Sequence, residues 1–220
     1  MPLFPIVVGV VFAAVGAAAE RLASAWPAEE ASHAGPRPRT VLLAVAAGVA
    51  GWGIAARSTL PWWATAFHLL VLGVLVVLTA TDWEQRRLPH LALDPLVVLG
   101  IASVPFNPSV TPLDAVIGGV AAVAFLWVAG LIVRDGVALG DLYLVGPLGL
   151  ILGWPAIFGA IFIAAFAVSA FSIGLLVTGR AAMKTYIPFG PFLVLGAVLT
   201  LLREPTLLGP FATAIAAALR

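Results

Sequence analysis

The 220-residue chain has no cysteine and very few charged residues. The absence of cysteine excludes disulfides, cysteine-ligated zinc and thiol catalysis. Charged residues make up only 10% of the chain, the formal net charge is +1, and the three histidines lie far apart in sequence. The balance of charge therefore gives no argument for a nucleic-acid partner, and the histidine spacing gives none for a metal site.

Apolar residues dominate instead, at 62% of the chain and with a mean hydropathy of +1.13. This composition is typical of a polytopic membrane protein. We predict an all-α bundle of about eight transmembrane helices, forming a single membrane domain over residues 1–220. A final apolar run, 207–219, is compatible with a short ninth helix. The eight predicted helices correspond to the runs Leu3 to Ala19, Val41 to Ala56, Trp62 to Ala80, Leu88 to Val104, Leu113 to Val133, Asp141 to Leu152, Ala156 to Val177 and Ile187 to Leu202.

The sixth and seventh runs are continuous in hydropathy and must be divided by a turn. Together they hold 37 residues, which as one helix would be about 55 Å long, against a hydrocarbon core of about 30 Å. Gly153-Trp154-Pro155 is the predicted turn, because proline disfavours helix at the residue before it and glycine tolerates a tight reversal. The sixth helix is then short, and Asp141 lies at its start.

The distribution of basic residues predicts the orientation in the membrane. With the N-terminus outside, eight Lys or Arg residues lie in the inside connections and two in the outside ones, which agrees with the positive-inside rule. Residues 3–19 are interpreted as a retained helix and not as a cleaved signal peptide. The connection over residues 20–40 is rich in Ala, Pro and Glu, and we expect a cytoplasmic loop there.

Two aspartates lie at the cytoplasmic ends of apolar runs. Asp82 follows the third run and opens the polar stretch Asp82-Trp83-Glu84-Gln85-Arg86-Arg87 before Leu88-Pro89, while Asp141 follows Gly140 at the start of the sixth run. A carboxylate next to hydrocarbon costs several kcal/mol unless it is paired or hydrated, so each is a candidate functional residue. Each also has a structural interpretation, Asp141 as a helix cap and Asp82 as a headgroup-level acid.

A third stretch makes the pattern more specific. Ile187-Pro188-Phe189-Gly190-Pro191-Phe192 enters an apolar run with two prolines and a glycine, and a helix start explains only one of the prolines. Three features of the chain have the order and spacing found in the bacterial prepilin peptidases. They are Asp82 followed by Leu88-Pro89, the pair Gly140-Asp141, and the stretch Ile187 to Phe192. The chain therefore resembles these type IV leader peptidases, which belong to the Gly-x-Gly-Asp intramembrane aspartyl proteases.

The resemblance implies a catalytic pair, Asp82 and Asp141, which cleaves the basic leader from type IV prepilins or pseudopilins at the cytoplasmic face of the bacterial inner membrane. It implies no metal. The chain departs from the family pattern at three positions: Ala138 replaces the first glycine, Tyr143 replaces a lysine, and His90 replaces an Asp or Asn. It also lacks the family's cysteine-containing cytoplasmic domain. We therefore expect peptidase activity without the S-adenosylmethionine-dependent N-methylation of many family members. The supporting or substrate-binding candidates are Gly140, Glu84, Pro89, His90, Tyr143, Pro188, Gly190 and Pro191.

Two carboxyl groups that share one proton can activate water and protonate a leaving amine, and they titrate as a coupled pair. Which of Asp82 and Asp141 begins as the anion stays open, although a helix N-terminus favours the anion at Asp141. Two other functions also stay open. One is an inactive relative that serves as a pilus-assembly scaffold, and the other is a proton-coupled transporter, since paired intramembrane acids also mark ion pathways.

Overall fold

The computed structural model describes residues 3–25, 37–85, 88–132, 138–179 and 187–203. These residues form eight α-helices joined by short connections, so the predicted all-α fold is confirmed. The predicted ninth helix at 207–219 lies outside the described residues. The helices are α1 (Leu3–Ala25), α2 (Arg37–Arg57), α3 (Trp62–Gln85), α4 (His90–Phe106), α5 (Pro112–Ile132), α6 (Leu139–Leu152), α7 (Ala156–Val177) and α8 (Gly190–Leu202).

Five of the helices, α1, α2, α3, α5 and α7, are long and apolar enough to cross a membrane. The 22 residues of α7 reach about 33 Å, slightly more than a hydrocarbon core of about 30 Å. The apolar helices α4, α6 and α8 have 17, 14 and 13 residues and are shorter than a full span. The protein is thus a multi-pass helical membrane bundle, with five full-length helices and three shorter ones among the described residues.

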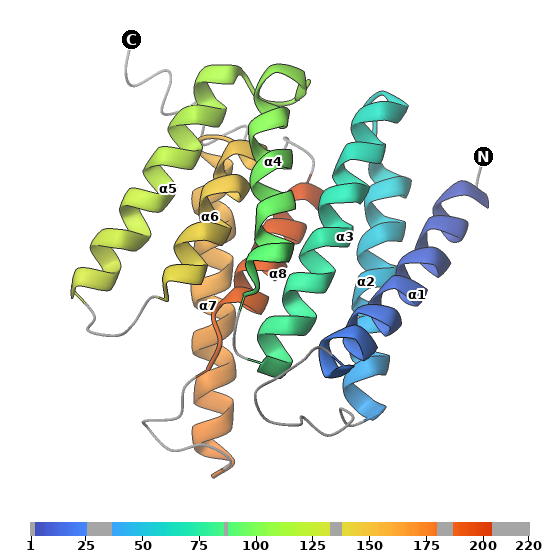
Figure 1. The fold of residues 1–220 in the computed structure, drawn as a ribbon, viewed down its shortest axis with the longest axis vertical. Helices are drawn as coiled ribbons and strands as arrows, with labels where there is room; N and C mark the ends of the chain where they lie inside the picture. The colour runs from blue at the N-terminus through green and yellow to red at the C-terminus, as the bar shows by residue number, and fades with distance from the viewer. Residues whose placement is uncertain (1–2, 26–36, 86–87, 133–137, 180–186, 204–220) are drawn as a thin grey trace.

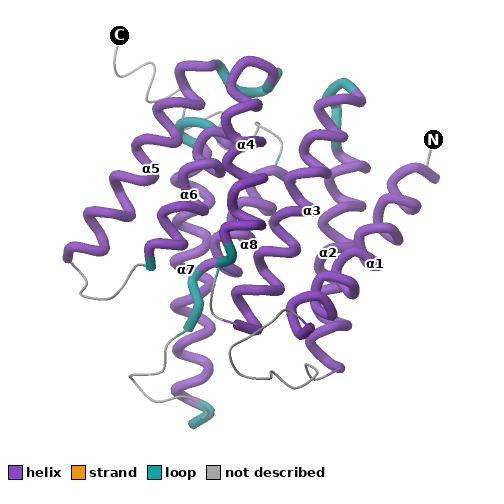
Figure 2. The backbone as a smooth tube through the Cα atoms, in the orientation of Figure 1, coloured by secondary structure: helices purple, strands orange, loops and turns teal. Residues whose placement is uncertain are grey.

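Helix α6 lies at the centre of the second half of the bundle (Figures 1 and 2). It contacts α4, α5, α7 and α8, whereas α1, α2 and α3 pack on one another. Helix α8 joins the two groups because it contacts α2 and α3 as well as α6 and α7. The short α6 and α8 are therefore held by the helices around them, and Asp141 and Gly190, near the starts of these two helices, are buried.

Glycines permit the close approach of α5 to α6. A Cβ atom added at Gly149 would come within 2.6 Å of the Gly118 carbonyl oxygen, and one added at Gly118 would meet the Gly149 carbonyl oxygen at the same distance. Any larger residue would force the two backbones apart. Small residues at helix interfaces are the usual means of close packing in membranes, where lipid removes the hydrophobic drive between helices.

The predicted turn between α6 and α7 is confirmed. Helix α6 ends at Leu152, Gly153 has a φ of 71°, and α7 begins at Ala156. Glycine suits this left-handed backbone, which costs other L-residues about 1–2 kcal/mol. The backbone N–H of Trp154 then donates to the Asp114 carbonyl oxygen at 2.9 Å, which ties the turn to α5.

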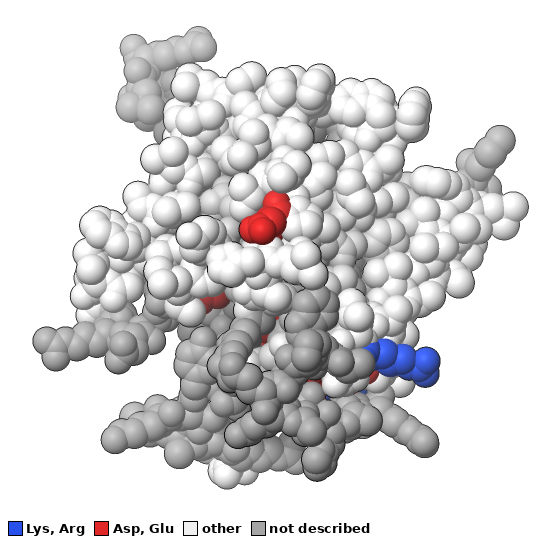
Figure 3. Space-filling model, viewed as in Figure 1, with Lys and Arg blue, Asp and Glu red and all other residues white. Residues whose placement is uncertain are grey.

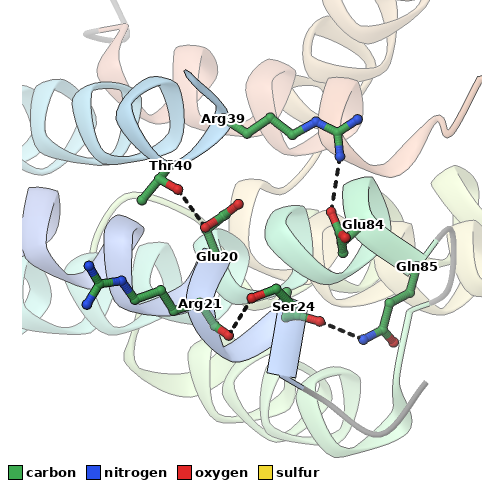
Figure 4. A network of polar contacts seen from close by, with 8 residues as sticks. Glu20, Arg21, Ser24, Arg39, Thr40, Glu84 and Gln85 are labelled. Atoms are coloured by element: carbon green, nitrogen blue, oxygen red, sulfur yellow. Dashed lines mark hydrogen bonds and ion pairs between the residues drawn. The ribbon is translucent and has the colours of Figure 1, made fainter. Parts of the chain in front are cut away.

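Two predicted boundaries are wrong, and tertiary contacts explain both. Helix α3 does not end before Asp82 but continues to Gln85, whose side-chain amide donates to the Ala23 carbonyl oxygen of α1 at 2.9 Å. The loop predicted over 20–40 is shorter, because α1 continues to Ala25 and α2 begins at Arg37. Polar side chains that looked like loop residues instead bond between these helices near their ends (Figure 4).

The surface agrees with a membrane location. On the face drawn in Figure 3, the described residues are mostly uncharged. The exceptions are an acidic group over α4, small acidic areas below it and a basic side chain at the lower right. Asp94 is the acidic residue of α4 and is exposed. Large apolar side chains such as Val98, Phe166 and Val177 are exposed as well, as expected where lipid replaces water.

Candidate active site

Asp82 lies in the last turn of α3 with only 6% of its surface exposed. Helix α3 is apolar from its first turn, and its buried face includes Leu75 and Leu78. Because the helix continues past Asp82, this residue is part of the helix and not of a loop, and its carboxylate lies against the neighbouring helices. The backbone N–H of Gly190 donates a hydrogen bond to this carboxylate, which offsets part of the cost of burying it.

Asp141 is the third residue of α6 and is 4% exposed. Ala138 is the N-cap residue of this helix, and its backbone N–H donates to Asp141 Oδ2 at 3.4 Å. The carboxylate therefore lies in the first turn of a helix, where unpaired N–H groups and the helix dipole favour negative charge. The side chain is nevertheless buried, so the capping interpretation describes only part of its environment.

The two carboxylates lie close enough for their charges to interact. They come from different helices, 59 positions apart in sequence, and both are almost completely buried. Two acidic groups placed this way repel when both are ionised, and a fold gains nothing in stability from the arrangement. A buried like-charged pair is a functional-site signal for that reason.

Gly190 explains the glycine of the third motif. It is the first residue of α8, and a Cβ atom added there would overlap Asp82 Oδ2. Glycine is thus required by close approach and not by backbone angle. Pro191 occupies the second position of α8, where its missing N–H is not needed, and Pro188 precedes the N-cap residue Phe189. The N-terminus of α8 is therefore directed at Asp82, as the N-terminus of α6 is at Asp141.

The Leu-Pro motif packs against the Gly-Asp motif. A Cβ atom added at Gly140 would lie 3.1 Å from Leu88 Cδ1, a contact that a flexible leucine can relax. Pro89 is the N-cap residue of α4 in an extended conformation, and Leu88 before it lies against the start of α6. The three motif segments, distant in the sequence, thus meet at one end of the bundle.

The departures from the family pattern have simple structural consequences. Ala138 has φ −78° and ψ 149°, an extended conformation that any L-residue adopts, so a glycine is not needed there. His90 and Tyr143 contact one another edge to face, with ring centroids 5.7 Å apart. Both are exposed, and the pair joins the first turn of α4 to the first turns of α6.

Glu84 is the one predicted site residue that points elsewhere. It lies two positions after Asp82, which on a helix places it about 200° around the axis. Its Oε2 accepts a hydrogen bond from Arg39 Nη1 of α2 at 3.0 Å (Figure 4). Sequence reasoning missed Glu20, which is 9% exposed within α1. A usable signal existed, since no proline or glycine lies between Gly16 and Pro27 to end that helix.

Comparison with known proteins identifies the same region. Residues 69–173, from α3 to α7, match the model of the type IV leader peptidase family, and both buried aspartates lie within the match. This chain is a relative of the type IV leader peptidases. No solved structure matches the chain significantly.

Proteins named prepilin leader peptidase/N-methyltransferase are similar to this chain over most of its length. The one from Aeromonas salmonicida (strain A449) is 32% identical over 154 residues, which is 68% of this chain and 53% of that protein. Those from Burkholderia pseudomallei (strain 1026b) and Bacillus subtilis (strain 168) are 34% and 28% identical over 59% and 61% of this chain, and 43% and 54% of their own lengths. The chain spans about half the length of the curated relatives that it matches.

Proposed function

We propose that this type IV leader peptidase relative is a membrane aspartyl endopeptidase in which Asp82 and Asp141 act together. The observation that carries the proposal is the burial of two interacting carboxylates from separate helices, each with a backbone N–H donor supplied at a helix N-terminus. The repulsion between two ionised groups favours a state with one proton shared by the pair. That state contains both a general base and a general acid.

In the proposed reaction, the ionised carboxylate removes a proton from a water molecule as the water oxygen attacks the carbonyl carbon of the scissile peptide. The protonated carboxyl group hydrogen-bonds to the carbonyl oxygen. The carboxyl pair then donates a proton to the leaving nitrogen as the C–N bond breaks. The products are a carboxylic acid and an amine. The pair ends with the single proton that it held at the start, so no metal or cofactor is required.

The proposed substrate is a type IV prepilin or pseudopilin, by analogy with the names of the relatives. The excess of basic residues on one side of the predicted topology supports a cytoplasmic position for both carboxylates, and hence cleavage of a basic leader at the inner-membrane face. In this proposal Gly140, Pro89, Pro188, Gly190 and Pro191 position the carboxylates. Exposed His90 and Tyr143 contact the substrate beside them, and Glu84 orders the adjoining helix end.

The test is co-expression of the chain with a prepilin and measurement of leader removal by gel shift. Asp82→Asn and Asp141→Asn each keep the shape of the side chain while removing its acid–base chemistry, and both are expected to abolish cleavage in folded protein. Asp114→Asn is the matched control, because this carboxylate caps α5 through Thr111 and has no proposed role in cleavage. Cleavage by either dyad variant would refute the mechanism, and its absence in the wild type would favour a scaffold or a proton-coupled transporter.

We further propose that the cleaved substrate is not N-methylated and that S-adenosylmethionine is not used. In the sequence, only residues 26–36 separate α1 from α2, where the resembled family carries a cysteine-containing domain. Mass spectrometry of a processed substrate tests this proposal. An unmodified new N-terminus is expected, and an added mass of one methyl group would contradict the proposal.

A further inference from the structure

A second feature of the bundle lies apart from the two aspartates. An elongated cavity of about 370 Å³ runs between α2, α3 and α8. Its lining is almost entirely apolar and includes Leu43, Ala47, Leu72, Val76, Phe192 and Val194. Along α2 it extends from Arg39 to Ala50, a distance of about 16 Å. Neither Asp82 nor Asp141 is among the lining residues.

The cavity opens toward lipid along its side. Several lining residues are themselves exposed on the outer surface, among them Leu42, Leu195 and Phe171. Trp83 also lines the cavity at its polar end and is 41% exposed, and tryptophan is enriched at the level of the lipid headgroups. An acyl chain in the adjacent leaflet can therefore enter from the side while its headgroup stays at the interface.

The polar end of the cavity carries an unsatisfied carboxylate oxygen. Glu20 is 9% exposed, and its Oε2 accepts a hydrogen bond from the Thr40 hydroxyl at 2.7 Å. Its Oε1 is buried and has no hydrogen-bond partner among the described residues. A buried carboxylate oxygen without a donor is costly, especially beside hydrocarbon. The missing partner is a hydrogen-bond donor, and a cationic one satisfies this oxygen best.

A cation lies beside this carboxylate. Arg39 precedes Thr40 and lines the same end of the cavity, where Figure 4 shows it extending over the space that Glu20 faces. One of its terminal nitrogens donates to Glu84, which leaves other N–H donors of the guanidinium group for an anion. The end of the cavity thus offers an acceptor for an ammonium group and donors for a phosphate, next to an apolar channel.

We propose that this cavity binds a zwitterionic aminophospholipid, with an acyl chain between α2, α3 and α8, the ammonium group on Glu20 Oε1 and the phosphate on Arg39. A primary ammonium group is required because it donates hydrogen bonds, which a trimethylated one cannot do. Neither carboxylate of the proposed catalytic pair lines the cavity, although Glu84 and Pro191, which lie beside the pair, do.

Native mass spectrometry of the purified full chain, delipidated in detergent, tests the proposal. The protein is titrated separately with phosphatidylethanolamine, phosphatidylcholine and phosphatidylglycerol of identical acyl chains. Wild-type protein is expected to bind phosphatidylethanolamine at least about tenfold more tightly than the other two, the factor expected from a hydrogen bond to a charged group. Equal binding of the three lipids would overturn the proposal without the use of any variant.

Two variants locate the bound lipid. Glu20→Gln is expected to remove the preference for phosphatidylethanolamine, whereas the control Asp94→Asn, which removes an exposed carboxylate of α4 outside the cavity, keeps it. Ala46→Trp, which fills the cavity from α2, is expected to weaken binding of the preferred lipid, and Ala56→Trp on the same helix is not. The lipid site would be rejected if Glu20→Gln kept the preference for phosphatidylethanolamine or if Ala46→Trp bound the lipid as tightly as the wild type. It would also be rejected if an equimolar prepilin displaced the lipid, because the cavity would then belong to the substrate.

Discussion

Replacing Gly190 by alanine is the sharpest test of how the carboxylates are positioned. The added Cβ atom overlaps Asp82 Oδ2, so either this carboxylate or the start of α8 must move. The start of α8 is constrained by Pro191 and by its packing on α3, α6 and α7. We therefore expect the Asp82 side chain to move and to point away from the Asp141 carboxylate.

The expected size of the effect follows from the overlap. Real Cβ atoms essentially never approach another heavy atom within 3.0 Å, so the carboxylate must move by on the order of 1 Å, and a displacement of that size at a reacting group lowers the rate about 100-fold. The assay is cleavage of a purified prepilin at saturating and limiting concentrations. The loss is expected in kcat, because the substrate-binding surface is unchanged.

The matched control is Gly73→Ala in α3. A Cβ atom added at Gly73 meets nothing within 4 Å, and alanine is favoured over glycine in a helix by about 0.5–1 kcal/mol. This variant should therefore cleave at the wild-type rate and melt at the same or a higher temperature. If Gly190→Ala also cleaved at the wild-type rate while folded, the position assigned to Asp82 beside the α8 N-terminus would be wrong.

Three further predictions concern the pair and its surroundings. The rate of cleavage should follow a bell-shaped curve when it is plotted against pH, since only the singly protonated pair contains both an acid and a base. A cleavage rate that does not change with pH would refute a shared proton. Gly153→Ala should lower the melting temperature by roughly 2–8 °C, because the positive φ costs about 1–2 kcal/mol, and the added atom also overlaps Val110; Gly174→Ala, which meets nothing within 4 Å, should not. A double-mutant cycle of His90→Ala and Tyr143→Ala, measured by thermal unfolding, should give a coupling of about 0.5–1.5 kcal/mol if the ring contact forms, and additive effects would contradict it.

Hydropathy predicted the number and approximate position of the described helices because membrane helices must satisfy their backbone hydrogen bonds within each segment. The turn at Gly153 was equally predictable, since a 37-residue apolar run cannot fit one bilayer crossing. The end of α3 at Gln85 was not predictable, because the hydrogen bond from Gln85 to α1 joins helices distant in the sequence and no local pattern records it. The continuation of α1 to Ala25 had a signal in the sequence, the absence of proline and glycine between Gly16 and Pro27, which the prediction did not use.

For the candidate site, the sequence likewise predicted the individual residues but not their arrangement. Asp82, Asp141 and Gly190 could be selected from the sequence, because carboxylates and paired prolines are conspicuous in an apolar chain. Their meeting depends on the packing of α3, α6 and α8, and the need for glycine at 190 becomes visible only beside Asp82 Oδ2. The cavity beside Glu20, whose Oε1 has no hydrogen-bond partner in the described part of the chain, likewise had no sequence signature. The sequence determines which groups are too costly to bury alone, and the tertiary structure decides which of them share a site, since side-chain contacts between helices depend on how the helices pack.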